Sequence, residues 1–197
     1  MKALPIVSLL ILSLIIGACV PNAKVESSNK LTIDPKMPDS LQQIKRYEAE
    51  QTKTSGENAQ TIPEAQIIDH DGASNFKALH YPQKAPRPNG DVVIWGPYET
   101  LQAGDYAAIY RISLSDVDYV IPLVSVDVTA EEATSGKPQV IAKADLPGTK
   151  FDEAGRFLIV TLPFKLTRQA RVELRVRWYG QTDMDLDYRA IAIPTEK

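Results

Sequence analysis

After Pro63 the apolar residues recur at every second position in short runs, and this periodicity constrains the fold more than any other feature of the chain. The clearest run is Ala170–Trp178, in which apolar and charged residues alternate. Its apolar positions are Val172, Leu174, Val176 and Trp178, and its charged positions are Arg171, Glu173, Arg175 and Arg177. Because successive side chains of a strand point to opposite faces of a sheet, the run predicts a β-strand with one buried face.

The stretch Val92–Leu114 contains two further strand-length runs with turn residues between them. The first run, Val92–Trp95, ends at Gly96-Pro97, and the second, Tyr106–Leu114, follows Gly104. Glycine and proline punctuate secondary structure, so the stretch predicts two strands joined by a corner. The positions expected on the core-facing side of the second strand are Tyr106, Ala108, Tyr110, Ile112 and Leu114.

Several other segments have the same character, whereas no segment after Pro63 combines helical periodicity with helical length. They are 65–68, 77–81, 123–129, 139–144, 156–164 and 186–192. About eight short strands separated by turn signals are typical of a sandwich. We therefore predict an all-β domain at 63–197, an antiparallel β-sandwich of the jelly-roll kind.

Residues 1–18 have the pattern of a secretory signal peptide. A positive start at Met1-Lys2 is followed by an apolar run at 3–16 and by small residues before Cys19. The apolar run falls short of the ~20 residues that a membrane-spanning helix needs. Cys19 is the single cysteine of the 197-residue chain, so an intrachain disulfide is excluded.

The residues Ile16-Gly17-Ala18-Cys19 resemble the lipobox of bacterial lipoproteins. The resemblance implies cleavage before Cys19, lipidation of its thiol and acylation of its new amine, hence an extracytoplasmic protein anchored to a membrane by acyl chains such as palmitate. Several chains hold a protein stably, whereas one alone is marginal. Because Val20 and not an aspartate follows, the resemblance implies the outer membrane where the host has one and the cell membrane otherwise. The alternative is an ordinary signal peptide with a chance cysteine.

The segment 19–62 has a different composition, rich in Ser, Asn, Lys, Gln, Glu and Pro. So little apolar surface cannot offset the entropy lost on ordering, which predicts a flexible tether between the anchor and the domain. One short helix at 39–51 is expected within it, because Leu41, Ile44 and Tyr47 would form one apolar stripe. A helix of that length is marginal in isolation.

The stretch around Trp95 resembles the galactose-binding-like jelly-roll domains of bacterial sugar-handling proteins. The resemblance rests on Trp95-Gly96-Pro97-Tyr98, followed by Leu101, Gly104 and Tyr106, and on the segments 172–176 and 186–191, which look like the last two strands of such a module. It implies a jelly roll similar to carbohydrate-binding modules, and often glycan binding at the loop end. It does not imply catalysis.

Aromatic residues beside turns are the candidate ligand-binding positions. They are Tyr98, Trp178, Tyr179 and Trp95. Sugars pack their C–H faces on aromatic rings while nearby polar groups bind the hydroxyls, which makes a ring at a sandwich loop a suitable platform. A core role is the competing interpretation for Trp178 and Trp95, because both continue the apolar side of a strand.

The charges near the C-terminus have two interpretations. If residues 179–183 form a hairpin, every cross-strand pair between the last two strands is opposite in sign, which would stabilise the sheet. If the two strands belong to opposite sheets, as in many jelly rolls, the charges find other partners. The resemblance also implies a structural calcium held by Glu64 and Asp187, against which solvated or paired acids are the alternative.

Composition and motifs argue against several functions. The net charge of −3 is unlike that of a nucleic-acid-binding domain, which usually has a basic face. The two histidines, His70 and His80, stand in no catalytic or zinc-binding motif. We therefore expect no enzyme and no cofactor apart from the candidate calcium. A hydrolase would need two carboxylates in one cleft, roughly 5–9 Å apart.

The residues leave two functions open. The first is a lipid-anchored module of the cell envelope that binds a carbohydrate, such as a cell-wall or exported polysaccharide. The second is an accessory or assembly lipoprotein that docks another envelope protein, through the sandwich or the stripe of Leu41, Ile44 and Tyr47, without binding sugar. A row of exposed aromatic rings would favour the first, and a broad apolar patch the second.

Overall fold

The computed structural model describes residues 30–55, 59–132 and 136–195. Its strands are β1 (Thr32–Asp34), β2 (Leu41–Glu48), β3 (Gln60–Thr61), β4 (Gln66–Asp69), β5 (Lys77–Tyr81), β6 (Asp91–Trp95), β7 (Glu99–Leu101), β8 (Gly104–Leu114), β9 (Pro122–Glu132), β10 (Gln139–Pro147), β11 (Leu158–Leu166), β12 (Ala170–Trp178) and β13 (Met184–Pro194). The helices are α1 (Ala49–Ser55) and the 3-10 turn η1 (Gly148–Lys150). Neither is long and apolar enough to cross a membrane. The predicted signal peptide and Cys19 lie outside the described residues.

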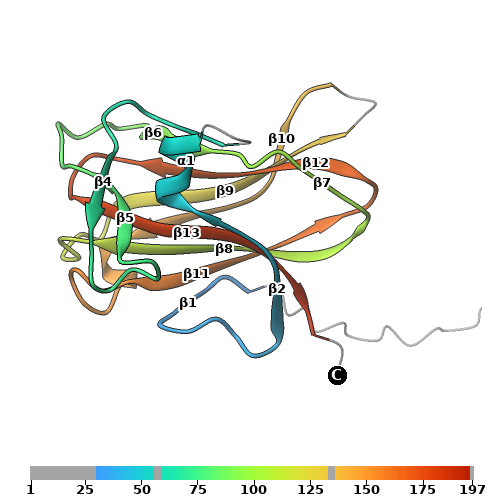
Figure 1. Cartoon of the computed structure of the whole chain (residues 1–197), viewed down its shortest axis with the longest axis horizontal. Coiled ribbons are helices and arrows are strands. Elements are labelled where there is room, and N and C mark those ends of the chain that lie inside the picture. The colour runs from blue at the N-terminus through green and yellow to red at the C-terminus, as the bar shows by residue number, and fades with distance from the viewer. Residues whose placement is uncertain (1–29, 56–58, 133–135, 196–197) are drawn as a thin grey trace, which may run out of the picture.

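The strands form two antiparallel sheets that stack as layers, with α1 at one side (Figure 1). Sheet A has seven strands in the order β1-β11-β8-β13-β5-β4, and β2 pairs with the second half of β13. Sheet B has six strands in the order β10-β9-β12-β6-β3, and β7 pairs with the first half of β12. The predicted all-β sandwich is therefore confirmed.

Apolar faces of both sheets meet in one core, as the period-two pattern predicted. The apolar residues of β12 are buried, and so are Val124, Val126 and Val128 on β9. On β8 the predicted core side faces the same cluster. The opposite side of β8 also carries buried apolar residues, Ala107 and Ile109, so this central strand is covered on both faces.

The strands β12 and β13 lie in opposite sheets, so the hairpin interpretation of the C-terminal charges is wrong and its alternative is confirmed. The chain crosses between layers at 179–183, where Gly180 has a φ of +83° and approaches the Ala85 carbonyl too closely for a side chain. The charges of β12 pair instead with β9 in the same sheet, for example Arg175 with Asp127.

The segment predicted as a tether with a helix at 39–51 is part of the sandwich from Thr32 onward, and most of that helix is strand β2. β2 pairs antiparallel with β13, and the helix α1 begins only at Ala49. The backbone hydrogen bonds between β2 and β13 stabilise this segment as a strand, whereas a helix of that length is marginal in isolation. The domain boundary consequently lies before residue 32 and not at 63.

The link between β1 and β2 crosses the outer face of sheet A as a strap, residues 35–40. Met37 in the strap and Leu41 after it pack against a small apolar cluster on that face. The cluster contains Ala107, Ile109, Ile159, Tyr188, Ala190 and Ala192. Its alanines let the strap approach the sheet closely, and the strap explains why β8 is buried on both sides.

Arg189 of β13 lies fully buried between the sheets, which is rare for an arginine. Its Nη1 donates a hydrogen bond to the Leu174 carbonyl on β12 at 2.8 Å and another to the Gly96 carbonyl after β6. Its Nη2 donates to the Thr52 hydroxyl on α1 at 3.5 Å. Burial lowers the pKa of Arg189 to about 10, so the guanidinium remains charged at neutral pH. One side chain thus joins both sheets and the helix.

We expect Arg189→Met to lower the free energy of unfolding by about 2–4 kcal/mol, because charge-assisted hydrogen bonds are lost and the Leu174 carbonyl stays buried without this donor. Urea unfolding of both proteins measures the difference. Arg171→Met is the control, since Arg171 is exposed and its ion pair is worth at most about 1 kcal/mol. Equal stability of the Arg189 variant and the wild type would contradict this role.

Candidate functional site

The outer face of sheet B carries a ladder of polar side chains contributed by β12 and β9. Since the apolar residues of both strands point inward, the alternate residues must point outward. They are Arg171, Glu173, Arg175 and Arg177 on β12, and Ser125, Asp127, Thr129 and Glu131 on β9. Charged residues therefore stand opposite hydroxyls or opposite charges across the two strands.

Hydrogen bonds fix this ladder in place. The Arg175 Nε donates to the Asp127 Oδ1 at 2.6 Å, and the Thr129 hydroxyl donates to the Glu173 Oε2 at 2.9 Å. The Asp127 attraction raises the pKa of Arg175, although burial opposes it with the largest single effect. Asp127 and Thr129 are only 3% and 2% exposed, so they form the floor of the face while the arginines extend over them.

Three of the four predicted ligand-binding aromatic residues lie on this same face. Tyr98, 40% exposed, lies 5.2 Å from the Arg171 guanidinium, measured to the ring centroid. Burial and then the neighbouring Glu173 raise the pKa of Tyr98, which places these two side chains together. Trp95 is half-buried and follows Ile94, which pairs with an inward residue of β12, so alternation turns Trp95 outward.

Tyr179 lies beyond the other end of β12, where its hydroxyl is 2.9 Å from the Ser125 Oγ. Trp95 and Tyr98 flank the middle and the start of the strand. The rings are thus distributed along β12, with arginine and carboxylate groups between them. Such a surface offers apolar ring faces and fixed hydrogen-bonding groups to one extended ligand.

Trp178 is the exception, and its prediction as a ligand-binding residue is wrong. Its side chain is 1% exposed, its Nε1 donates to the Thr182 carbonyl at 2.9 Å, and its ring lies 6.4 Å from that of Tyr81 in the core. The inward alternation of β12 continues through this last residue, so the core interpretation holds.

The two predicted calcium ligands, Asp187 and Glu64, bind other groups of the protein. Asp187, at an irregularity of β13, accepts hydrogen bonds from the Ser74 N–H at 3.1 Å and hydroxyl at 2.7 Å, and it pairs with Arg111. Glu64 pairs with Lys84 at 3.2 Å, and its own backbone N–H and that lysine lower its pKa. Among the described residues no group of three or more His, Cys, Asp or Glu could hold a metal ion. The acids are paired, as the alternative interpretation had it.

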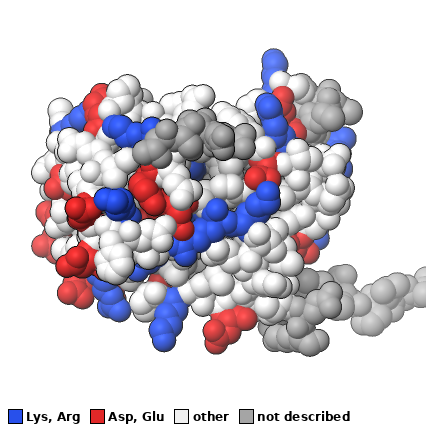
Figure 2. Space-filling model, viewed as in Figure 1, with Lys and Arg blue, Asp and Glu red and all other residues white. Residues whose placement is uncertain are grey.

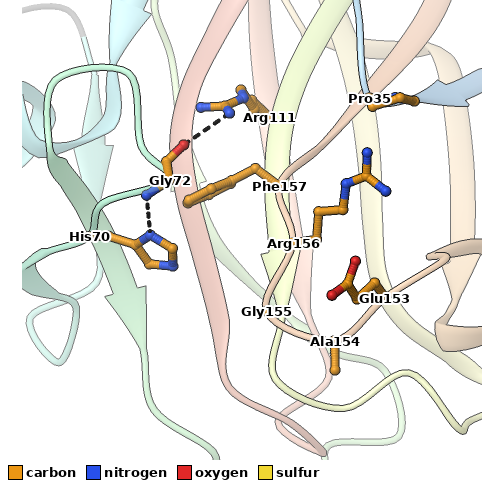
Figure 3. A pocket seen from close by; sticks show the side chains of 9 residues that line it. All are labelled: Pro35, His70, Gly72, Arg111, Glu153, Ala154, Gly155, Arg156 and Phe157. Carbon is orange, nitrogen blue, oxygen red and sulfur yellow. Dashed lines mark hydrogen bonds between the residues drawn. The ribbon is translucent and has the colours of Figure 1, made fainter.

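A cleft of about 520 Å³ opens on the outer face of sheet A (Figure 3). The strap borders it at Pro35, the β4–β5 loop at His70, and the loop before β11 at Arg156. Its aromatic residue, Phe157, is only 5% exposed, because the Arg111 guanidinium lies 4.8 Å over the ring and the His70 ring meets its edge at 4.8 Å. The cleft therefore offers no open ring to a sugar.

Sequence patterns alone missed this cleft, although one signal was available. Arg111 interrupts an otherwise apolar strand at an outward position, and such a residue needs a partner on the sheet surface. The sequence pattern did not indicate that the β4–β5 loop would bring His70 into the lining of this cleft. It also did not indicate that Asp187 would form an ion pair with Arg111. His80 is also a structural residue, with its Nδ1 2.7 Å from an Asp185 oxygen.

The side of the molecule shown in Figure 2 has a row of basic side chains bordered by acidic ones, where β2 and α1 lie in Figure 1. Two basic residues of β2 are paired: Lys45 lies 3.1 Å from Glu99 of sheet B, and Arg46 lies 2.6 Å from Glu48. These two basic side chains of β2 are therefore paired with carboxylates of the protein itself.

No family model matches the chain, and no curated protein matches its sequence. Among solved structures, the CBM22-1 xylan-binding domain of Paenibacillus barcinonensis Xyn10C is 7% identical, with a TM-score of 0.50 over 81% of this chain and 100% of that domain. The CBM22-1–GH10 modules of Clostridium thermocellum endo-1,4-β-D-xylanase 10B, complexed with xylohexaose, are 12% identical, with a TM-score of 0.50 over 71% of this chain and 27% of that one. This chain thus spans about a quarter of the solved CBM22-1–GH10 chain. At such identity the likeness shows the fold, a jelly-roll β-sandwich shared with carbohydrate-binding modules.

We expect Asp187→Asn to lower the free energy of unfolding by about 1–3 kcal/mol, because the half-buried Arg111 loses its counter-charge. The loop that Asp187 holds through Ser74 should also become more sensitive to proteolysis. Urea unfolding and limited proteolysis measure the two effects. Asp69→Asn, at an exposed pair with Lys77, is the control and should leave the urea unfolding midpoint unchanged. Unchanged stability of the Asp187 variant would contradict the anchoring role.

Proposed function

We propose that this protein is a non-catalytic carbohydrate-binding module and that the outer face of sheet B binds an extended polysaccharide chain. The observation that carries the proposal is the placement of Trp95, Tyr98 and Tyr179 along one face, over a ladder of fixed charged groups. Pyranose C–H faces pack on such rings, and carboxylates and guanidinium groups bind the hydroxyls in directed hydrogen bonds.

Pre-organisation of the ladder supports binding. Because Asp127, Thr129 and Arg175 are already held by hydrogen bonds, little side-chain entropy is lost when a ligand arrives. The same bonds argue against catalysis, since the carboxylates of Asp127 and Glu131 are ion-paired with arginines. A glycosidase needs one of its two carboxyl groups to be protonated as the general acid, and an ion pair with arginine favours the ionised form.

The structural neighbours support the same ligand class by analogy of fold. One is named a xylan-binding domain, and the other was solved with xylohexaose. Unrelated functions share folds, so the ligand class rests on the residues of sheet B and not on the likeness.

The alternative of a protein-docking lipoprotein loses one of its two proposed surfaces, the stripe of Leu41, Ile44 and Tyr47. Leu41 and Tyr47 pack against the apolar clusters of the fold, and Ile44 alone of the predicted stripe is exposed. A single exposed isoleucine is ordinary on a protein surface and does not form a docking stripe.

We expect Trp95→Ala and Tyr98→Ala each to weaken binding to a soluble polysaccharide about 3- to 10-fold, because an aromatic contact contributes about 0.5–1.5 kcal/mol. Affinity electrophoresis in gels containing soluble xylan or mixed-linkage glucan measures the loss. Phe76→Ala is the matched control: Phe76 is 69% exposed, but it lies in the β4–β5 loop of sheet A. Absence of retardation of the wild type in every polysaccharide, or an equal loss in the control, would refute the proposal.

We also propose that a lipid on Cys19 holds the module at the cell surface, in the outer membrane where the host has one. The support is the sequence Ile16-Gly17-Ala18-Cys19 after an apolar run of signal-peptide length. Mass spectrometry of the mature protein should find Cys19 as the first residue, carrying acyl groups. A mature chain that begins elsewhere, or an unmodified Cys19, would refute the anchor and leave the binding proposal intact.

A further inference from the structure

The outward arginines of β12 are not equivalent. Arg171 pairs with Glu131, and Arg175 pairs with Asp127. Arg177 has no carboxylate within 4.0 Å among the described residues, although it occupies the same face of the same strand. This part of the proposed binding face therefore carries an arginine without an ion pair of its own, and Asp145 on β10 attracts its charge at longer range.

The side chain of Arg177 is nevertheless held in position. Its Nη1 donates to the Gly90 carbonyl at 3.0 Å and to the Asn89 carbonyl at 3.3 Å. Gly90 has a φ of +57°, and a Cβ there would lie 2.8 Å from the Arg177 Cγ, so a residue without a side chain makes room for the arginine stem. A guanidinium fixed on one edge keeps its other N–H groups for a ligand.

That acidic residue already has closer partners. Asp145 of β10 accepts a hydrogen bond from the Ser125 hydroxyl and pairs with Lys143 at 2.9 Å. Ser125 stands directly opposite Arg177 across the β9–β12 pair and also contacts the Tyr179 hydroxyl. Arg177 thus lies beside one of the three aromatic rings of the face, with a hydroxyl and not a carboxylate opposite.

We propose that the polysaccharide bound by sheet B is acidic, with uronic-acid carboxylates, and that Arg177 binds one of these carboxylates while Tyr179 contacts the sugar ring. This inference rests on the proposed binding face. A planar guanidinium presents two parallel N–H groups that match the two oxygens of a carboxylate, and the charge-assisted pair is about twice as strong as a neutral hydrogen bond.

The test compares polygalacturonate with the same polymer after chemical reduction of its carboxylates to primary alcohols. Affinity electrophoresis at low ionic strength should show that the wild type binds the acidic polymer about 10-fold more tightly. Arg177→Gln should bind both polymers equally, and Arg177→Lys, which keeps the charge without the planar fork, should show an intermediate preference. Arg156→Gln is the matched control, because Arg156 pairs with Asp152 and borders the cleft of sheet A, outside the proposed binding face, and it should keep the wild-type preference. Unfolding midpoints establish that the variants are folded.

Each other outcome decides the question. A wild type that binds both polymers equally, or an Arg177→Gln variant that keeps the preference, overturns the inference while the glycan-binding proposal stands. Dextran sulfate of matched charge density bound as tightly as polygalacturonate would overturn selection for a carboxylate. Failure of the wild type to bind any acidic or neutral polysaccharide would instead overturn the proposed function itself.

Discussion

A single buried cation determines how the two layers of this protein fit together. The Arg189 side chain extends from sheet A into the core, where it donates hydrogen bonds to two backbone carbonyls of the sheet B side and to the Thr52 hydroxyl of α1. A charge of this kind is costly to bury, and only well-placed acceptors compensate for that cost. One acceptor is the Gly96 carbonyl, next to Trp95 and two residues before Tyr98. The same contact that aligns the sheets therefore fixes the corner that carries two rings of the proposed binding face.

The two outer faces of the sandwich are used differently. On sheet A the strap and the β4–β5 loop cover the strands, and Asp187 ties that loop down. On sheet B the strands β9 and β12 keep their own polar side chains at the surface, paired across the strands. A covered face favours stability, whereas an uncovered ladder with rings beside it can accept a long ligand. The two faces differ because the strap and the β4–β5 loop both pack on sheet A.

Period-two alternation predicted the strands and the inward faces of β8, β9 and β12. It therefore also predicted the outward positions of β9 and β12, which form the proposed binding face. The same pattern placed Trp178 on the inward side of β12. The ligand-binding role was suggested only by the position of Trp178 beside a turn. The segment at 41–48 was misassigned because its apolar spacing fits a helix locally, and only the free edge of β13 makes it a strand. Asp187 and Arg111 are far apart in sequence, so their pairing depends on topology that no local pattern encodes.

The N-terminal segment protects both sides of sheet A, since β1 extends the sheet beyond β11 and β2 runs beside the second half of β13. A fragment that begins at Pro63 would keep every ring of the proposed binding face, yet the strand edges that β1 and β2 cover would be exposed to solvent. Rows of unpaired amide and carbonyl groups recruit strands from neighbouring molecules, so such a fragment would self-associate. The strands β1 and β2, which follow the proposed anchor, thus also prevent edge-to-edge association of the protein.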